Sequence, residues 1–113
     1  SMNDNDGAGP FITAKYNDAF IKVKEVDFRK GASKFTSRIG TAQNENVSME
    51  IRLDTKDGEL LGTVNVPMTG GNDKWSLQTI DVKKTSGIHD LYFVFKGKSK
   101  TDILYFDYWK FLE

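Results

Sequence analysis

The stretch Thr85–Gly97, TSGIHDLYFVFKG, decides the fold class of this chain of 113 residues. A Ser-Gly turn leads into a predicted strand over Asp90–Lys96, and a second glycine ends it. Successive strand residues point to opposite sides. The residues of the two predicted faces are Leu91, Phe93 and Phe95, and Tyr92 and Val94. A strand that is apolar on both faces is predicted to lie inside a two-layer β structure rather than at its edge.

The same alternation recurs along the chain. It is cleanest over Val47–Asp54, where every second residue is apolar, and Lys56-Asp57-Gly58 then predicts a hairpin turn. No window shows convincing helical periodicity. The segments predicted as strands are Phe11–Tyr16, Phe20–Phe28, Lys34–Ile39, Val47–Asp54, Glu59–Val66, Trp75–Val82, Asp90–Lys96 and Ile103–Leu112. The pattern predicts an all-β fold of mainly antiparallel strands, with a sandwich favoured over a barrel.

In two of these predicted strands, strict alternation of residues does not separate an apolar face from a polar one. The faces of Phe20–Phe28 are mixed, which suggests that its two ends meet different layers. In Ile103–Leu112, strict alternation gives two sets of residues, of which one must face the core. The two sets are Tyr105, Asp107 and Trp109, and Phe106, Tyr108 and Lys110.

Composition and charge exclude several classes of protein. Lys plus Arg equals Asp plus Glu, at 16 each, so the formal net charge is zero. A general binder of nucleic acid or of an anionic membrane would need a basic excess. No apolar run is long enough to span a bilayer. Residues 1–10 are predicted to be a flexible lead-in that begins with a cloning remnant, Ser1-Met2, and residues 11–113 are predicted to form one domain.

No group of residues predicts a catalytic centre. His89 is the single histidine, and its neighbour Asp90 points to the other side of the same strand, so a structural role is favoured. Asp54, Asp57 and Glu59 lack the further acidic ligands of an EF-hand loop, and a solvated hairpin tip is the favoured interpretation. We therefore predict that the domain has no catalytic residues.

The string TSG-x-HDLY-x-VF-x-G resembles a signature of the family 6 carbohydrate-binding modules, the β-sandwich appendages of secreted polysaccharide-degrading enzymes. Similar strings follow the family's order and spacing at Met49–Gly62, Val66–Gly71 and Phe106–Phe111. The resemblance covers roughly residues 11–113. It implies a β-jelly roll of two antiparallel sheets, of the kind found at the C-terminus of family 43 glycoside hydrolases. It also implies an extracellular or periplasmic location and two partners, a polysaccharide and a catalytic domain of the same parent chain.

In the family, the principal sugar cleft resembles a clamp of two aromatic rings and an asparagine. A ring can cover the axial C–H groups of a pyranose, and an amide both donates and accepts hydrogen bonds. The tyrosine of the clamp corresponds here to Phe20, or its place is partly taken by Tyr16. Asn72 stands where a tryptophan often follows Thr-Gly-Gly, and Tyr105 stands in the place of the asparagine. The resemblance thus implies weak binding of a xylan or β-glucan.

The alternative function is that of a degenerate module, which packs on a catalytic domain and binds no sugar.

The family's structural calcium has only a partial counterpart in this sequence. The family binds it with acidic side chains of an opening strand and with the aspartate that is Asp107 here. No such acidic strand precedes Phe11. Calcium takes about 6–8 oxygen ligands, so Asp107 alone is an incomplete site. We therefore expect no cofactor, with a structural calcium as the less favoured alternative.

Overall fold

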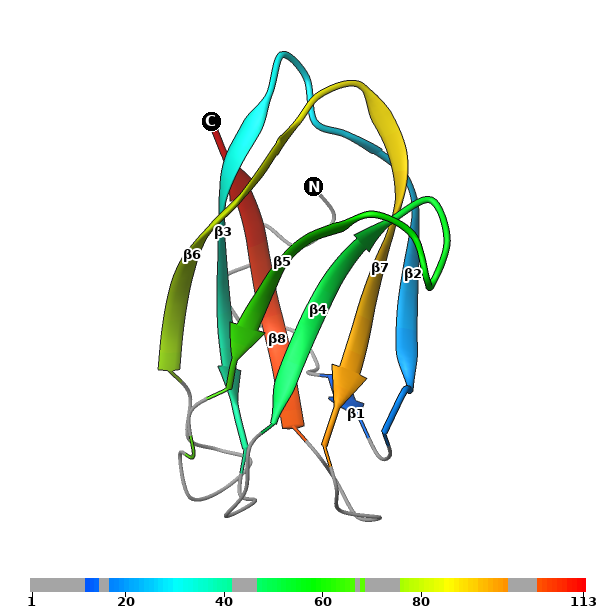
Figure 1. Ribbon diagram of the computed structural model, residues 1–113. Helices are drawn as coiled ribbons and strands as arrows, with labels where there is room; N and C mark the ends of the chain where they lie inside the picture. The colour runs from blue at the N-terminus through cyan, green and yellow to red at the C-terminus, as the bar shows by residue number, and fades with distance from the viewer. Residues whose placement is uncertain (1–11, 15–16, 42–46, 67, 69–75, 98–103) are drawn as a thin grey trace.

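The computed structural model describes residues 12–14, 17–41, 47–66, 68, 76–97 and 104–113. These residues form β strands in two antiparallel sheets that face each other (Figure 1). The strands are β1 Ile12–Ala14, β2 Phe20–Asp27, β3 Ala32–Gly40, β4 Ser48–Leu53, β5 Leu60–Asn65, β6 Ser76–Thr85, β7 Ile88–Lys96 and β8 Leu104–Leu112. One sheet has the order β1-β8-β3-β6 and the other β2-β7-β4-β5. The predicted β-sandwich is confirmed.

β7 occupies the interior position that its sequence predicts. It pairs with β2 on one side and with β4 on the other. Phe93 is fully buried on the core face, and Val94 on the opposite face is only 2% exposed. The prediction that this strand does not lie at a sheet edge is therefore confirmed.

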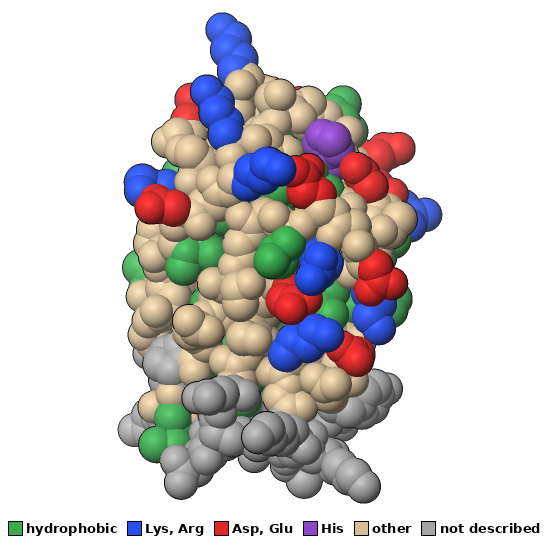
Figure 2. Space-filling model, in the orientation of Figure 1, with side chains coloured by type: hydrophobic (Ala, Val, Ile, Leu, Met, Phe, Trp, Pro, Cys, Tyr) green, Lys and Arg blue, Asp and Glu red, His purple; other side chains and the backbone are tan. Residues whose placement is uncertain are grey.

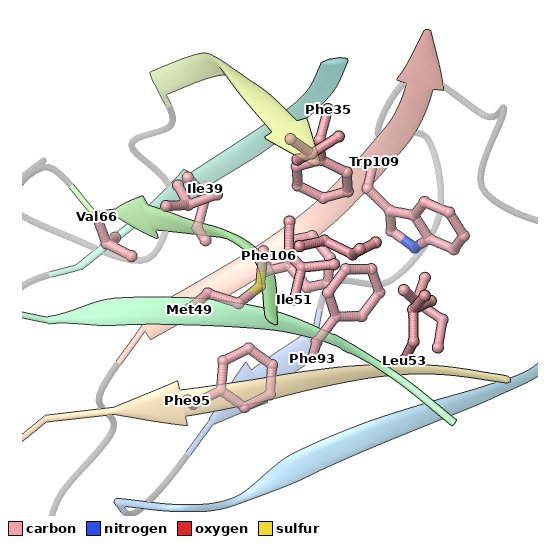
Figure 3. Close-up of a cluster of buried hydrophobic side chains, with 14 of the residues drawn as sticks. Phe35, Ile39, Met49, Ile51, Leu53, Val66, Phe93, Phe95, Phe106 and Trp109 are labelled. Atoms are coloured by element: carbon pink, nitrogen blue, oxygen red, sulfur yellow. The ribbon is translucent and has the colours of Figure 1, made fainter. Parts of the chain in front are cut away.

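The core is a cluster of aromatic rings from both sheets (Figure 3). The Phe93 ring lies at its centre, with ring centroids 5.2 Å from Phe106, 5.3 Å from Trp109 and 5.7 Å from Phe35. The first of these pairs meets edge to face, a geometry that aromatic rings prefer. The inward residues of β4 complete this layer, as the period-2 pattern predicted: Met49, Ile51 and Leu53.

A β-bulge explains the mixed faces of β2. Val23 pairs with Leu91 and Val26 pairs with His89, so β2 holds one residue more than β7 over this interval. Glu25 has a positive φ of 56° there. The extra residue reverses the alternation, and both Val23 and Val26 pack against the core. The suggestion that the ends of this strand meet different layers was wrong.

A second bulge corrects the predicted faces of β8. Tyr108 pairs with Arg38 and Phe106 pairs with the next residue, Ile39, so Asp107 is the extra residue in this strand. Phe106 and Trp109 are consequently both buried, at 1% and 4% exposed. Strict alternation had placed these two on opposite faces, which was wrong because a bulge changes the phase of every residue beyond it.

The predicted lead-in 1–10 and the first residue of the predicted strand Trp75–Val82 lie outside the described ranges. Within the described part of the chain, no helix is long and apolar enough to cross a membrane.

Candidate functional site

Phe20 is the one predicted sugar-contact residue whose side chain the structure describes. It is the first residue of β2, and 49% of its surface is exposed. The backbone of Tyr105 pairs with Thr13 and with Gly40. Tyr16 and Asn72 lie outside the described residues. The end of β1 and the starts of β2 and β8 lie at the same, lower end of the sandwich (Figure 1). Because three of the four side chains lie outside what the structure describes, their convergence on one cleft stays a prediction.

Phe20 belongs to the outer face of the sheet β2-β7-β4-β5. The cross-strand register places two rows of outward residues side by side on this face. From β2 to β4 the rows are Phe20, Val94 and Glu50, and then Lys22, Tyr92 and Arg52. Figure 2 views the molecule from this side, and basic and acidic side chains alternate there around small hydrophobic areas. The sheet thus presents rings and ion pairs together.

The rings of Phe20 and Tyr92 form an aromatic pair on this face. Their centroids are 5.7 Å apart, and the ring planes are tilted by 41°. Val94, the cross-strand partner of Phe20, belongs to the same face and is only 2% exposed. An exposed ring on a supported apolar base can stack on the C–H face of a sugar. The sequence separated Tyr92 from the core residues of β7 but could not place it next to Phe20, because that requires the register.

The connection between β4 and β5, residues 54–59, crosses over this face (Figure 1, green). The Asp54 backbone N–H donates a hydrogen bond to the Asp90 carbonyl at 2.8 Å, which ties the connection to β7. Nη1 of Arg52 donates to the Gly58 carbonyl at 2.8 Å. The result is that Nζ of Lys56 lies 5.2 Å from the centroid of the Phe20 ring. Sequence reasoning missed Lys56, since nothing local shows that a hairpin loop reaches β2.

His89 anchors the same connection at its base. Its Nδ1 lies 3.2 Å from both carboxylate oxygens of Asp54, and its Nε2 lies 3.0 Å from the carbonyl oxygen of Ser86. Its ring also lies beside buried Phe28, with centroids 6.1 Å apart. These contacts fit the structural role that the sequence favoured, although the carboxylate partner is Asp54 rather than its neighbour Asp90.

The charges of this face are largely paired. Lys96 and Asp18 form a hydrogen-bonded ion pair, Arg52 Nε and Glu50 Oε1 lie 3.0 Å apart, and Lys22 Nζ lies 3.7 Å from Asp90 Oδ2. Lys56 has no carboxylate oxygen within ion-pair distance among the described residues; its recorded neighbour is the Phe20 ring. Lys56 nevertheless contributes to the lowered pKa of Asp18 by electrostatic attraction, so Lys56 and Lys96 share this carboxylate.

Hydrogen bonds on this face shift the pKa values of three side chains. The hydrogen bond from Lys96 lowers the pKa of Asp18, and the same bond raises the pKa of Lys96. A hydrogen bond with Tyr92, followed by attraction to the phenolic oxygen, raises the pKa of Lys22. Both lysines thus remain cations at neutral pH, and Asp18 remains an anion.

The described residues contain no group of three histidine, cysteine or acidic side chains that could hold a metal ion. Asp54, which the sequence placed in an acidic hairpin tip, contacts His89, and Glu59 pairs with Lys83. The side chain of Asp107 lies outside what the structure describes, so the calcium prediction is not tested.

Known proteins resemble this chain over almost its whole length. It is 35% identical over 102 residues to the arabinoxylan arabinofuranohydrolase of Bacillus subtilis, which covers 90% of this chain and 20% of the relative. Its fold matches a β-1,3-glucan binding module of family 6 from Bacillus halodurans with a TM-score of 0.86, at 32% identity, over 98% of this chain and 82% of that one. It matches a module from Clostridium stercorarium in complex with cellobiose with a TM-score of 0.81, at 30% identity, over 96% and 77%.

The chain spans about a fifth or less of the length of the curated relatives that it matches. A family model for carbohydrate binding modules of family 6 matches residues 2–113. The matched range includes both sheets and the outer face that carries Phe20. This chain therefore belongs to the family 6 carbohydrate-binding modules.

Proposed function

We propose that this module binds a plant-type polysaccharide of the xylan or β-glucan class, and that it binds weakly. The exposed Phe20 ring carries the proposal, because it is an apolar platform at the start of β2 and its position corresponds, by resemblance, to the tyrosine of the family clamp. The names of similar proteins support the glycan class: one acts on arabinoxylan, one is in complex with cellobiose and one binds a β-1,3-glucan. Binding is weak because Asn72 and Tyr105 stand in place of two clamp residues.

One stacked ring contributes about 0.5–1.5 kcal/mol beyond the area it buries. Loss of the Phe20 ring should therefore weaken binding roughly two- to tenfold. Isothermal titration calorimetry with xylohexaose and cellohexaose measures this for Phe20→Ala. Leu77→Ala is the matched control, since Leu77 is an apolar residue of the other sheet and is 64% exposed. Equal losses in both variants, or none in Phe20→Ala, would contradict the proposed site.

We propose further that the module is part of a longer secreted glycoside hydrolase, located outside the cell or in the periplasm, in which a separate domain carries out catalysis. This proposal is supported by the similar enzymes, because the match to this chain covers only 20% and 18% of their length. Removal of the module from such an enzyme should leave hydrolysis of a short soluble substrate unchanged and reduce hydrolysis of the insoluble polysaccharide. A loss of activity on the short substrate would contradict a purely accessory role.

A groove on the molecule supports a second candidate function, a stabilising domain that packs on a catalytic domain. The groove has a volume of about 570 Å³ and lies between the bulge of β2 and the end of β8. Its wall includes the core aromatic residues Phe28, Trp109 and Phe111. Phe28 and Trp109 are themselves only 4% exposed, and charged residues such as Lys24 and Arg29 also line the groove, so a domain that packs here would need both charged and apolar groups. This candidate predicts no binding to any glycan, together with slower amide exchange in β2 and β8 when the module is in its parent enzyme.

A further inference from the structure

We propose that His89 makes a pH-sensitive contact: its protonated ring holds the connection between β4 and β5 against the turn between β6 and β7, and loss of the proton loosens the connection. The ring lies at the surface beside acidic side chains (Figure 2, purple), and 30% of its side chain is exposed, so it can exchange protons with water. The inference does not depend on the proposed function, because it concerns the end of the sandwich where β7 begins.

The hydrogen-bond partners of the ring are the first argument. Nδ1 of His89 lies 3.2 Å from both carboxylate oxygens of Asp54, and Nε2 lies 3.0 Å from the carbonyl oxygen of Ser86. An ionised carboxylate and a carbonyl group can only accept hydrogen bonds. A protonated imidazole donates to both of them. A neutral imidazole carries one N–H, so the lone pair of its other nitrogen faces an oxygen atom and one of the two contacts is lost.

The surroundings of the ring are the second argument. Among the described residues, Asp54 is the carboxylate within ion-pair distance of His89. The residue opposite on β2 is the apolar Val26, and the Phe28 ring packs beside the imidazole with centroids 6.1 Å apart. The ionised Asp54 therefore attracts the charged ring and not the neutral one.

The other charged residues of the neighbouring elements are exposed or have contacts of their own. Asp90 Oδ2 lies 3.7 Å from Lys22 Nζ, the Asp27 carboxylate accepts the Arg29 backbone N–H, and Glu59 pairs with Lys83. The ammonium group of Lys56 lies near the Phe20 ring. Those that are exposed at this end of the sandwich are Arg29, Lys30, Asp57 and Lys84.

The backbone at Asp54 is the third argument. Asp54 has a φ of 69°, in the left-handed region that residues other than glycine seldom adopt. Such a conformation persists only where surrounding contacts hold it. The contacts of Asp54 are its N–H bond to the Asp90 carbonyl at 2.8 Å and its carboxylate contact with His89. Loss of the second contact should make local opening at Asp54 easier. Because the same connection brings Lys56 to the Phe20 ring, its opening changes the cover of that ring.

The turn between β6 and β7 is held without His89. The Gly87 N–H donates to the Arg29 carbonyl at 3.1 Å, and the Gly87 carbonyl accepts from the Phe28 N–H at 2.8 Å. Both bonds join this turn to the turn between β2 and β3. The connection between β4 and β5 is therefore the side of the contact that loosens.

Native-state hydrogen exchange of the Asp54 amide, measured by NMR as a protection factor from pH 5 to pH 8, tests the proposal. The chain has a single histidine, and histidine is the side chain that ordinarily changes charge in this range. We expect the protection factor to fall about two- to fivefold as the pH rises, which corresponds to loss of an exposed ion pair. The Phe95 amide, bonded to the Ala19 carbonyl at the other end of β7, is the internal control and should not change. A constant protection factor at Asp54 would overturn the inference.

Three variants separate this contact from the general charge of the protein. The pH dependence should disappear in His89→Gln, whose side chain does not titrate, and should shrink in Asp54→Asn. Asp57→Asn is the matched control, because it removes an exposed carboxylate from the same connection, and it should keep the pH dependence. A dependence that persists in His89→Gln, or that Asp57→Asn removes as fully as Asp54→Asn, would overturn the inference. If a variant does not fold, the wild-type measurement decides by itself.

Discussion

Replacement of Phe93 by alanine should cost about 3–5 kcal/mol of the free energy of unfolding. Phe93 has no exposed surface, and its ring contacts three others, those of Phe35, Phe106 and Trp109, within 5.7 Å between centroids. Its strand is held on both sides by β2 and β4, so the backbone cannot collapse into the space left by the ring. The cost should therefore lie in the upper half of this range.

Urea unfolding followed by tryptophan fluorescence measures the loss, because Trp109 is buried beside Phe93. Domains of this size have about 5–15 kcal/mol of stability, so the alanine variant can approach complete unfolding, and Phe93→Leu provides a smaller loss that remains measurable. Phe20→Ala is the control, with an expected loss below about 1.5 kcal/mol because half of that ring is already in water. A loss below about 1 kcal/mol for Phe93→Ala would refute the reasoning.

Three further predictions concern the surface. Gly58→Ala should lower stability by roughly 1–3 kcal/mol in thermal unfolding, because its Cβ would overlap the Leu53 carbonyl oxygen; unchanged stability would show that the connection has another path. The pair of Lys96 with Asp18 should stabilise the fold most between the usual pKa values of 3.8 and 10.5. The lowered pKa of Asp18 means that its contribution is lost as pH falls below 3.8, and the raised pKa of Lys96 means that its contribution is lost above 10.5; a Lys96→Met stability gap that is constant with pH would contradict this. A chelator should change the melting temperature little, because Asp107 alone is an incomplete calcium site; a drop of several degrees would reveal further ligands.

The fold could be predicted from the sequence because most of its strands alternate. In β4 and β7, each apolar residue at an inward position is buried, so a period-2 pattern was sufficient. The pattern failed in β2 and β8, where one strand holds a residue more than its partner at Glu25 and at Asp107. A bulge depends on the pairing of two strands that are far apart in the sequence, so no local pattern signals it.

The site was less predictable for the same reason. Phe20 could be selected from its own position and from the family clamp. Its neighbours Tyr92 and Lys56 could not, because one requires the register of β2 with β7 and the other requires the path of the connection after β4. That path depends on a backbone contact at Gly58, which composition and spacing do not reveal. Side chains brought together by register and by loops have to be read from the structure.

The central claim is that this module binds a plant-type polysaccharide through the Phe20 ring. Affinity gel electrophoresis on soluble xylan, mixed-linkage β-glucan and laminarin, with the wild-type module and Phe20→Ala side by side, tests it most directly. The account predicts that at least one of these polysaccharides retards the wild-type module and that it retards Phe20→Ala measurably less. Equal retardation of both proteins, or none for the wild-type module on any of the three, would contradict it.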